Sequence, residues 1–258
     1  MRKHILILFL LIANVIYALG QYEEVRKELD SVIVKPLPYT NAPKNPPRKA
    51  PVIYTENAII HPKVSTSFKQ PIIGKMELPI FVYTDYECTQ KLPVYPPSDG
   101  NMGGFQFVSD KHDCYVLYLN IADEEFNHYR RLLATFDKTG KRVDYIEVGL
   151  SWDAWICLEQ FSIDTAMQVV VNKLTPMEKE PVKNSFFESF TGYRTDTYYQ
   201  ILKNGEIIKT KEVVFEPQLY YGPTPEERKE GYWYFISRGD EKVKTITECN
   251  ERVSSPYP

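Results

Sequence analysis

The chain lacks the short motifs that most often reveal an activity. It has no G-x-S-x-G nucleophile elbow, no G-x-G-x-x-G or Walker phosphate loop, and no H-E-x-x-H zinc motif. Histidine is scarce at four residues, and only His112 and His128 lie in the part that we expect to fold as a domain. The usual sequence evidence for hydrolysis, nucleotide binding and zinc catalysis is therefore missing.

A basic block is also missing. The chain has 31 Lys and Arg against 34 Asp and Glu, a net charge of −3. Residues 1–20 hold Arg2 and Lys3 but no acid, so the rest of the chain has 29 basic residues against 34 acidic ones, a net charge of −5. A mildly acidic chain without a basic run lacks the electrostatic footprint of a general nucleic-acid binder, so we expect no nucleic-acid partner.

The first twenty residues have the pattern of a secretory signal. Arg2 and Lys3 precede an apolar run at Ile5–Ile12, and small residues, Ala18 and Gly20, stand before Gln21. An uninterrupted apolar run of eight residues is too short for a retained membrane anchor, which needs about 20. We therefore expect a cleaved signal at residues 1–20, export to the periplasm or the cell exterior, and no transmembrane segment after cleavage.

Export changes how the cysteines are interpreted, because an oxidising compartment permits disulfides. The four cysteines are Cys88, Cys114, Cys157 and Cys249, and they allow two disulfides in three possible pairings. A Cys88–Cys249 bridge would close a very long loop of the unfolded chain and would stabilise the fold most in the chain-entropy model. The alternative is buried free thiols, which the apolar surroundings of Cys157 favour.

Proline concentrates in an N-terminal arm at residues 21–79, which holds nine of the nineteen prolines. Proline removes a backbone donor and interrupts both helices and central strands, so we expect this arm to be extended or disordered. Three interpretations stay open: a spacer, an ordinary disordered tail, or an arm whose apolar pieces, such as Val52–Tyr54, pack along the domain.

From residue 80 to 250 the chain alternates short apolar and aromatic runs with turn signals, as antiparallel all-β domains do. The connections are too short for parallel crossovers. We expect a meander that forms a sandwich or a partly closed barrel, and a flexible tail at residues 251–258. The expected strands are Ile80–Tyr86, Phe105–Ser109, Cys114–Ile121, Leu132–Phe136, Arg142–Val148, Trp155–Ile163, Met167–Lys173, Gly192–Leu202, Glu206–Phe215, Tyr232–Ser237 and Lys242–Thr247.

Three glycine-tipped turns predict hairpins. Gly140 stands where a type I turn with a bulge needs a positive φ, Asn204-Gly205 is a strong hairpin signal, and Ser237–Glu241 predicts a third hairpin. The segments Phe136–Val148 and Ile201–Val213 align at a constant offset of 65, which indicates either an internal duplication or two similar ladders. One short helix is expected at residues 224–230, from a capping box that ends at a glycine.

The signal segment and two of these hairpin regions carry a resemblance. Phe136–Lys141 reads aromatic-Asp-Lys-x-Gly-Lys, and Tyr193–Tyr199 leads into Lys203-Asn204-Gly205. Together they resemble secreted β-rich proteins of gut-type Gram-negative bacteria, over about residues 132–215. The resemblance implies a secreted β-rich fold and carries over neither an activity nor an active residue.

Aromatic residues are the strongest compositional feature of the domain. Exposed Tyr and Trp bind sugars and peptides by stacking, although aromatics also pair across strands in a core. Glu159 joins the candidates because it falls on the otherwise apolar strand face of Phe161 and Ile163, where a carboxylate is paired, lines a ligand cavity or lies at a sheet edge. The candidate ligand-binding residues are Trp152, Trp155, Glu159, Tyr193, Tyr198, Tyr232, Trp233 and Tyr234.

No residue is predicted to be catalytic, to bind a metal or to hold a cofactor. The cluster at Asp110–Cys114 lies on an expected turn, where Asp serves turn geometry. We therefore expect an exported, non-catalytic binding or assembly protein whose partner is a glycan, a peptide or an envelope protein. The alternative is a hydrolase of glycans or peptides that uses two carboxylates, with Asp153, Glu159, Glu188 and Asp196 as candidates, or one carboxylate with His112 or His128. A third interpretation is a structural protein with neither function.

Overall fold

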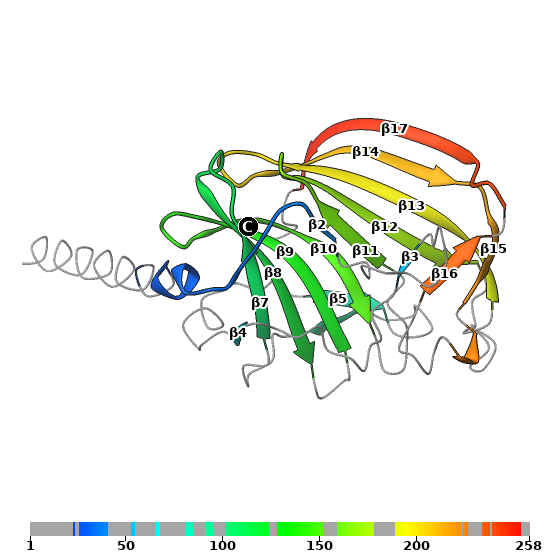
Figure 1. The fold of residues 1–258 in the computed structure, drawn as a ribbon, viewed down its shortest axis with the longest axis horizontal. Coiled ribbons are helices and arrows are strands. Elements are labelled where there is room, and N and C mark those ends of the chain that lie inside the picture. Colours follow the sequence, from blue (N-terminus) through cyan, green and yellow to red (C-terminus); the bar gives the residue numbers. More distant parts are fainter. Residues whose placement is uncertain are drawn as a thin grey trace, which may run out of the picture.

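Two antiparallel-rich sheets pack together as an all-β sandwich in the computed structural model (Figure 1). The predicted signal at residues 1–20 lies outside the described residues. The structure describes residues 23, 26–40, 53–54, 66–67, 81–84, 91–94, 102–123, 128–151, 159–177, 189–222, 224–226, 234–237 and 239–253.

The first sheet, sheet A, has six strands in the order β1-β7-β8-β9-β10, with β4 also paired to β7. Its long strands form the expected up-and-down meander, in which each strand pairs with the next along the chain. The strands of sheet A are β1 (Val34–Lys35), β4 (Thr66–Ser67), β7 (Met102–Phe107), β8 (Cys114–Asp123), β9 (His128–Asp137) and β10 (Arg142–Ser151).

The second sheet, sheet B, has nine strands in the order β2-β11-β12-β13-β15-β16-β3, and β14 joins β13 to β17. Strand β13 is long enough to pair with β15 at its start and with β14 at its end. The strands of sheet B are β2 (Tyr39–Thr40), β3 (Ile53–Tyr54), β11 (Glu159–Ile163), β12 (Gln168–Pro176), β13 (Ser189–Ile201), β14 (Ile207–Phe215), β15 (Gln218–Tyr221), β16 (Tyr234–Ser237) and β17 (Val243–Arg252).

Each expected strand overlaps an observed one. The short strands β1 to β4 of the arm were not expected, and within residues 80–250 two strands were missed. These are β15 and β6 (Lys91–Val94), the partner of β5 (Phe81–Thr84) in a separate two-stranded sheet. The expected strand Trp155–Ile163 is observed from Glu159 onward. Strand β17 continues to Arg252, beyond the expected end of the domain.

The core between the sheets is rich in aromatic rings. Tyr39 of β2 inserts between them, with its ring centroid 5.3 Å from Phe105, 5.1 Å from Phe107 and 5.6 Å from Phe161. Tyr118 stacks on Phe161 across the two sheets at 5.5 Å. Alternating residues of β7, β8 and β11 supply these rings, because successive side chains of a strand point to opposite faces.

The outer face of sheet A is also buried, under part of the N-terminal arm. Leu29, in a helical turn at residues 26–30, and Val32 are buried against it. Gln106 fastens this layer, because its side-chain amide donates to the carbonyl oxygens of Leu29, over 3.2 Å, and Val32, over 2.8 Å. Burial on both faces explains why β8 reads as one apolar run rather than an alternating one. Of the interpretations left open for the arm, packing along the domain fits residues 26–40.

Two of the predicted hairpins share one turn geometry. Gly140 has a φ of 91° and Gly205 a φ of 90°, which L-residues rarely adopt. The N–H of Gly140 donates to Asp137 O over 3.0 Å, and that of Gly205 donates to Leu202 O over 2.9 Å. The hairpin β9–β10 lies in sheet A and β13–β14 in sheet B, so the two similar segments occupy opposite layers.

The third predicted hairpin, at Ser237–Glu241, is wrong. Its two flanking strands exist, but β16 pairs with β15 and β3, whereas β17 pairs with β14. The physical reason is that β16 and β17 run on in the same direction beside β15 and β14, and the N–H of Glu216 donates to Lys242 O over 2.8 Å between the two ladders, so the chain does not turn back. Of the helix expected at residues 224–230, Pro225 and Glu226 are helical and the remainder lies outside the described residues.

The described cysteines form no disulfide. Cys114 and Cys249 are free thiols, while Cys88 and Cys157 lie outside the described residues. The Cys88–Cys249 bridge therefore stays a prediction. Within the part of the chain that the structure describes, no helix is both long and apolar enough to cross a membrane.

Candidate functional site

Sheet B reaches beyond the edge of sheet A (Figure 1). The cross-strand pairs show where the inner face changes from apolar to polar side chains. Phe161 pairs with Val171 in the core, and the next inward pair along the same strands is Glu159 with Lys173. Lys173 pairs in turn with Thr195 of β13. Apolar pairs thus give way to charged and hydroxyl side chains within one step along the ladder.

We call this region the polar inner face. Its members are contributed by four neighbouring strands, β11 to β14, and all lie on the side of sheet B that faces sheet A. They are Glu159, Lys173, Thr195, Thr197, Tyr199, Lys209 and Glu212.

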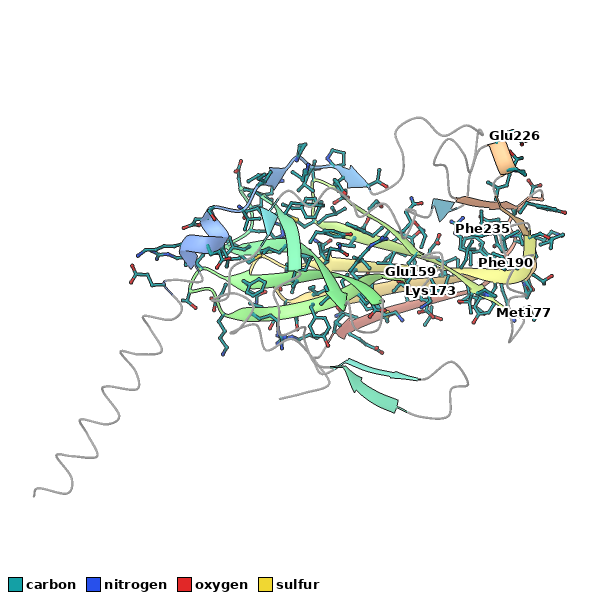
Figure 2. The ribbon with its side chains drawn as sticks, turned by 90° about the horizontal axis from the view of Figure 1, so that it is seen from below. Glu159, Lys173, Met177, Phe190, Glu226 and Phe235 are labelled. Carbon is teal, nitrogen blue, oxygen red and sulfur yellow. The ribbon has the colours of Figure 1, made fainter. Side chains whose placement is uncertain are left out.

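Two ion pairs organise the polar inner face. Lys173 Nζ lies 2.7 Å from Glu159 Oε1, and Figure 2 shows the two side chains beside each other. Lys209 Nζ donates to Glu212 Oε2 over 2.7 Å. Glu159 is buried, whereas Lys173 is 54% exposed, so the first pair joins the core to the open surface. The interpretation of Glu159 as a paired carboxylate is therefore the one that the geometry supports.

A β-bulge brings Lys209 and Glu212 to the same face. Tyr199 pairs with Lys209 and Tyr198 with Lys211, so Thr210 is an extra residue in β14. Side chains three positions apart on a regular strand point to opposite faces, and one inserted residue restores them to the same face. The sequence carries no distinct signal for this insertion.

Tyr199 lies beside Lys209 in the sheet, and its phenol interacts with the charges of both ion pairs. Burial raises the pKa of its phenol, Lys209 lowers it in part, and the carboxylates of Glu212 and Glu159 raise it further. The phenol therefore stays protonated near neutral pH and can donate a hydrogen bond. The net formal charge of the polar inner face is zero, because its two acids are matched by two lysines.

The predicted aromatic residues do not form one platform. Tyr193 pairs with Thr175 on the inner side of β13, whereas Tyr198 pairs with Lys211 on the outer side, where Lys211 Nζ lies 4.4 Å from the tyrosine ring centroid. Only the backbone of Tyr234 is described. The predicted site residues Trp152, Trp155, Tyr232 and Trp233 lie outside the described residues.

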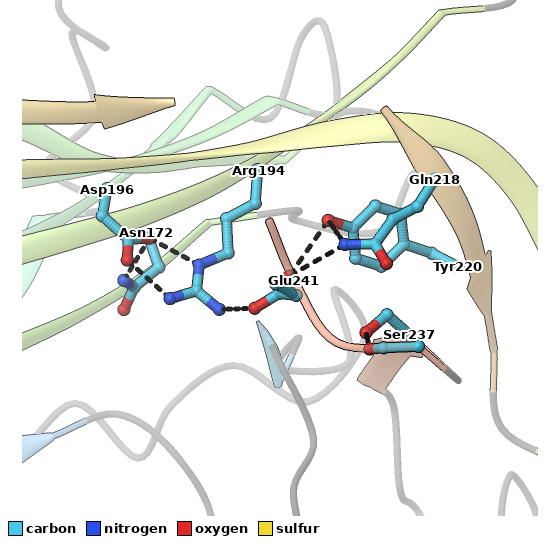
Figure 3. A network of polar contacts seen from close by, with 8 residues as sticks. Asn172, Arg194, Asp196, Gln218, Tyr220, Ser237 and Glu241 are labelled. Atoms are coloured by element: carbon cyan, nitrogen blue, oxygen red, sulfur yellow. Dashed lines mark hydrogen bonds and ion pairs between the residues drawn. The ribbon is translucent and has the colours of Figure 1, made fainter. Parts of the chain in front are cut away.

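A second polar network lies on the outer face of sheet B (Figure 3). Arg194 forms a two-pronged ion pair with Asp196, with Nε 2.7 Å from Oδ1 and Nη2 2.5 Å from Oδ2. Asn172 Nδ2 donates to Asp196 Oδ1 over 2.6 Å. Burial alone would lower the pKa of Arg194, but its hydrogen bond and charge interaction with Asp196 raise it.

Glu241 extends this network to β15. It accepts a hydrogen bond from Arg194, and its Oε1 accepts one from the Tyr220 hydroxyl over 3.1 Å. Burial raises the pKa of Glu241, although Arg194 opposes the shift. Beside the network, Phe190 and Phe235 pack edge to face at 5.0 Å and form a small second core with Tyr220 (Figure 2). The network therefore seals that core.

The described candidates for acid and base chemistry are engaged in structural contacts. Asp196, a candidate hydrolase carboxylate, is held by Arg194 and Asn172. His112 bridges two elements: its Nε2 lies 3.1 Å from Ile201 O and its Nδ1 lies 3.1 Å from Ser109 Oγ. Because a carbonyl only accepts, Nε2 carries a proton in this contact, and in a neutral imidazole Nδ1 then accepts from the hydroxyl. Asp153 and Glu188 lie outside the described residues.

Among the residues with a described structure, no three His, Cys, Asp or Glu side chains come together in a group that could hold a metal ion. No family model matches the chain, and neither a curated protein nor a solved structure is similar to it. The chemistry of the polar inner face is therefore the starting point for a function.

Proposed function

We propose that this chain is an exported, non-catalytic protein that binds a neutral glycan through the polar inner face. The observation that carries the proposal is the change from apolar to polar cross-strand pairs at Glu159 and Lys173, on a part of sheet B that extends past its packing partner. A sheet face that only supported the core would continue its apolar pairs.

The composition of the face favours a neutral, hydroxyl-rich ligand. The face has as many lysines as carboxylates, so a strongly charged ligand of either sign would be repelled by one of the two sets of side chains. Thr195, Thr197 and Tyr199 add hydroxyl groups that both donate and accept hydrogen bonds, as sugar hydroxyls do. Tyr193, one pair further along β13, is half-buried and offers a ring for stacking.

A glycan array and a peptide array test the proposal directly. Wild-type protein is compared with Lys173→Met and Thr197→Val, which remove a charge and a hydroxyl from the polar inner face. Lys211→Met is the matched control, because Lys211 lies on the opposite face of the same sheet. We expect neutral glycans to bind wild type and the control, and to bind the two inner-face variants at least tenfold more weakly.

Several outcomes would overturn the proposal: binding confined to peptides, glycan binding that the inner-face variants leave unchanged, or hydrolysis of the bound glycan. Export has its own test. The intact mass of the protein recovered from the cell envelope or medium should correspond to a chain that begins at Gln21.

A further inference from the structure

The C-terminal strand β17 is a long, open edge of sheet B. It pairs with β14 on one side, and no other described strand pairs with it (Figure 1). Nearly every residue of its ten is exposed, including two apolar ones, Ile246 at 60% and Val243 at 48%. An edge strand presents a row of unpaired backbone N–H and C=O groups, which is a template for a further strand.

The sequence of β17 is complementary to itself. In an antiparallel pair of two copies with Ile246 on the two-fold axis, Lys244 of one copy lies opposite Glu248 of the other, and the reverse holds at the opposite end. Thr245 then lies opposite Thr247, also twice. Opposite charges and Thr–Thr pairs are the cross-strand neighbours that stabilise antiparallel sheets. We propose that two copies of this chain associate through β17 in this register.

The exposed apolar side chain of Ile246 fits this arrangement. Val213 is its partner on β14, so Ile246 lies on the outer face of sheet B beside a buried valine. In the dimer it meets its own symmetry mate on that same face, and the two isoleucines cover each other. A two-fold interface repeats each contact, so a single strand supplies the whole interface.

Glu248 links the interface to the rest of the sheet. It pairs with Lys211 of β14 within one copy and would meet Lys244 of the other copy on its free side. Lys211, Glu248 and Lys244 of the other copy then form a row of alternating charges across the joined sheets. A register moved by one residue would end this alternation and would take Ile246 off the axis.

The irregular ends of β17 restrict pairing to this central segment. Register shifts occur between Val214 and Phe215 and between Lys209 and Lys211, so β17 pairs regularly with β14 only over Thr245–Glu248. Bulges and an edge lysine are also the means by which proteins prevent indiscriminate edge pairing. Lys244 is itself the extra residue of one bulge and lies directly beside the regular segment, so the proposed register is short and ends at the two Lys244–Glu248 pairs.

Charge reversal tests the dimer and its register together. Analytical ultracentrifugation of the purified full chain over a range of concentrations gives the dimer dissociation constant. Lys244→Glu and Glu248→Lys each place like charges opposite each other twice, and each should raise that constant about tenfold. The double variant Lys244→Glu/Glu248→Lys restores both pairs between the copies, although it places a lysine opposite Lys211 of β14, and should recover most of the lost affinity. Lys111 is an exposed turn residue outside β17. Lys111→Glu is therefore the matched control and should leave the dimer dissociation constant unchanged.

A melting curve of each variant confirms that the monomer is folded. The proposal is overturned if wild type sediments as a monomer at every concentration, if the single reversals leave the dimer intact, or if the double variant dissociates as readily as the single ones. It does not depend on the proposed glycan binding, because Lys244 and Glu248 lie outside the polar inner face. A dimer without glycan binding, or the reverse, would separate the two proposals.

Discussion

The carboxylate of Asp144 lies 3.1 Å from Arg252 Nε, although the two residues are 108 positions apart and belong to different sheets. Asp144 is 2% exposed, and its Oδ2 also accepts a hydrogen bond from the backbone N–H of Ile207 over 3.0 Å. Glu206 Oε1 holds the other side of the Arg252 guanidinium at 2.6 Å. One buried carboxylate thus connects β10 of sheet A to β14 and β17 of sheet B.

Replacing this carboxylate should weaken the contact between the sheets. We expect Asp144→Ala to lower the free energy of unfolding by about 2–4 kcal/mol, because a buried N–H and the half-exposed Arg252 lose their acceptor. Urea unfolding measures the loss. Glu206→Ala, which removes the more exposed partner of Arg252, is the control and should cost less than about 1 kcal/mol. Equal losses for the two variants would contradict this role of Asp144.

The turn at Gly205 should tolerate no side chain. Its φ of +90° strains any L-residue, and an added Cβ would lie 3.2 Å from Cys114 Cβ. We expect Gly205→Ala to destabilise the fold by about 2 kcal/mol or more, from backbone strain and the close contact together. Gly239→Ala is the matched control, because nothing lies within 4 Å of a Cβ there. Thermal unfolding measures the stability of both variants. A Gly205→Ala protein as stable as the Gly239→Ala protein would refute the expectation.

Glu241 should make stability fall as pH rises. Burial raises the pKa of Glu241 in the folded protein above its ordinary value of 4.5, so the folded state holds the proton more tightly than the unfolded state. This contribution is complete below pH 4.5 and is lost as the pH rises through the folded pKa. Glu241→Gln cannot ionise, so it should gain stability relative to wild type between pH 4 and 7.

The measurement for Glu241 is urea unfolding of both proteins across that pH range. Asp240→Asn, exposed and one residue away, controls for the removal of one negative charge from the same loop. A Glu241→Gln protein that loses stability relative to wild type as the pH rises would show the opposite linkage.

The thiol of Cys114 should be unreactive in the folded protein. Burial raises its pKa from 9.0 to about 11, so roughly one thiol in a thousand is ionised at pH 8. Alkylation with iodoacetamide, followed by peptide mapping, should modify Cys114 only after denaturation. The half-buried Cys249 should react in the native protein and serves as the internal control. Modification of Cys114 at the rate of Cys249 would contradict the packing of β8 against the Gly205 turn.

Local chemistry made the strands and two turns predictable. Gly140 and Gly205 mark turns because their backbone conformation is one that other residues rarely adopt, and that information lies within five residues. Strand β15 was missed because Pro217 and Gly222 crowd its four residues with turn signals. The third hairpin failed for a different reason: β16 and β17 continue in one direction beside β15 and β14, and no local pattern encodes which strands pair.

The candidate site was predictable only in part. Glu159 was identified because a carboxylate interrupts an apolar strand face, and that anomaly is visible in the sequence. Its partner Lys173 depends on the register of β11 against β12, which turn lengths and packing decide together. Lys209 and Glu212 share a face only through the bulge at Thr210. By contrast, the alternation of Thr195, Thr197 and Tyr199 with other residues along one strand was a usable signal that was not exploited.

Hydrogen–deuterium exchange with a bound ligand tests the central claim most directly. The protein is saturated with the neutral glycan that binds it best on the array, and protection of the backbone amides is compared with that of the free protein. We predict slower exchange in peptides from β12, β13 and β14 that contain Lys173, Thr195–Tyr199 and Lys209–Glu212, with no change in β8 and β9. Protection confined to sheet A or to the Arg194 network, or none in β12 to β14, would contradict the polar inner face as the binding surface.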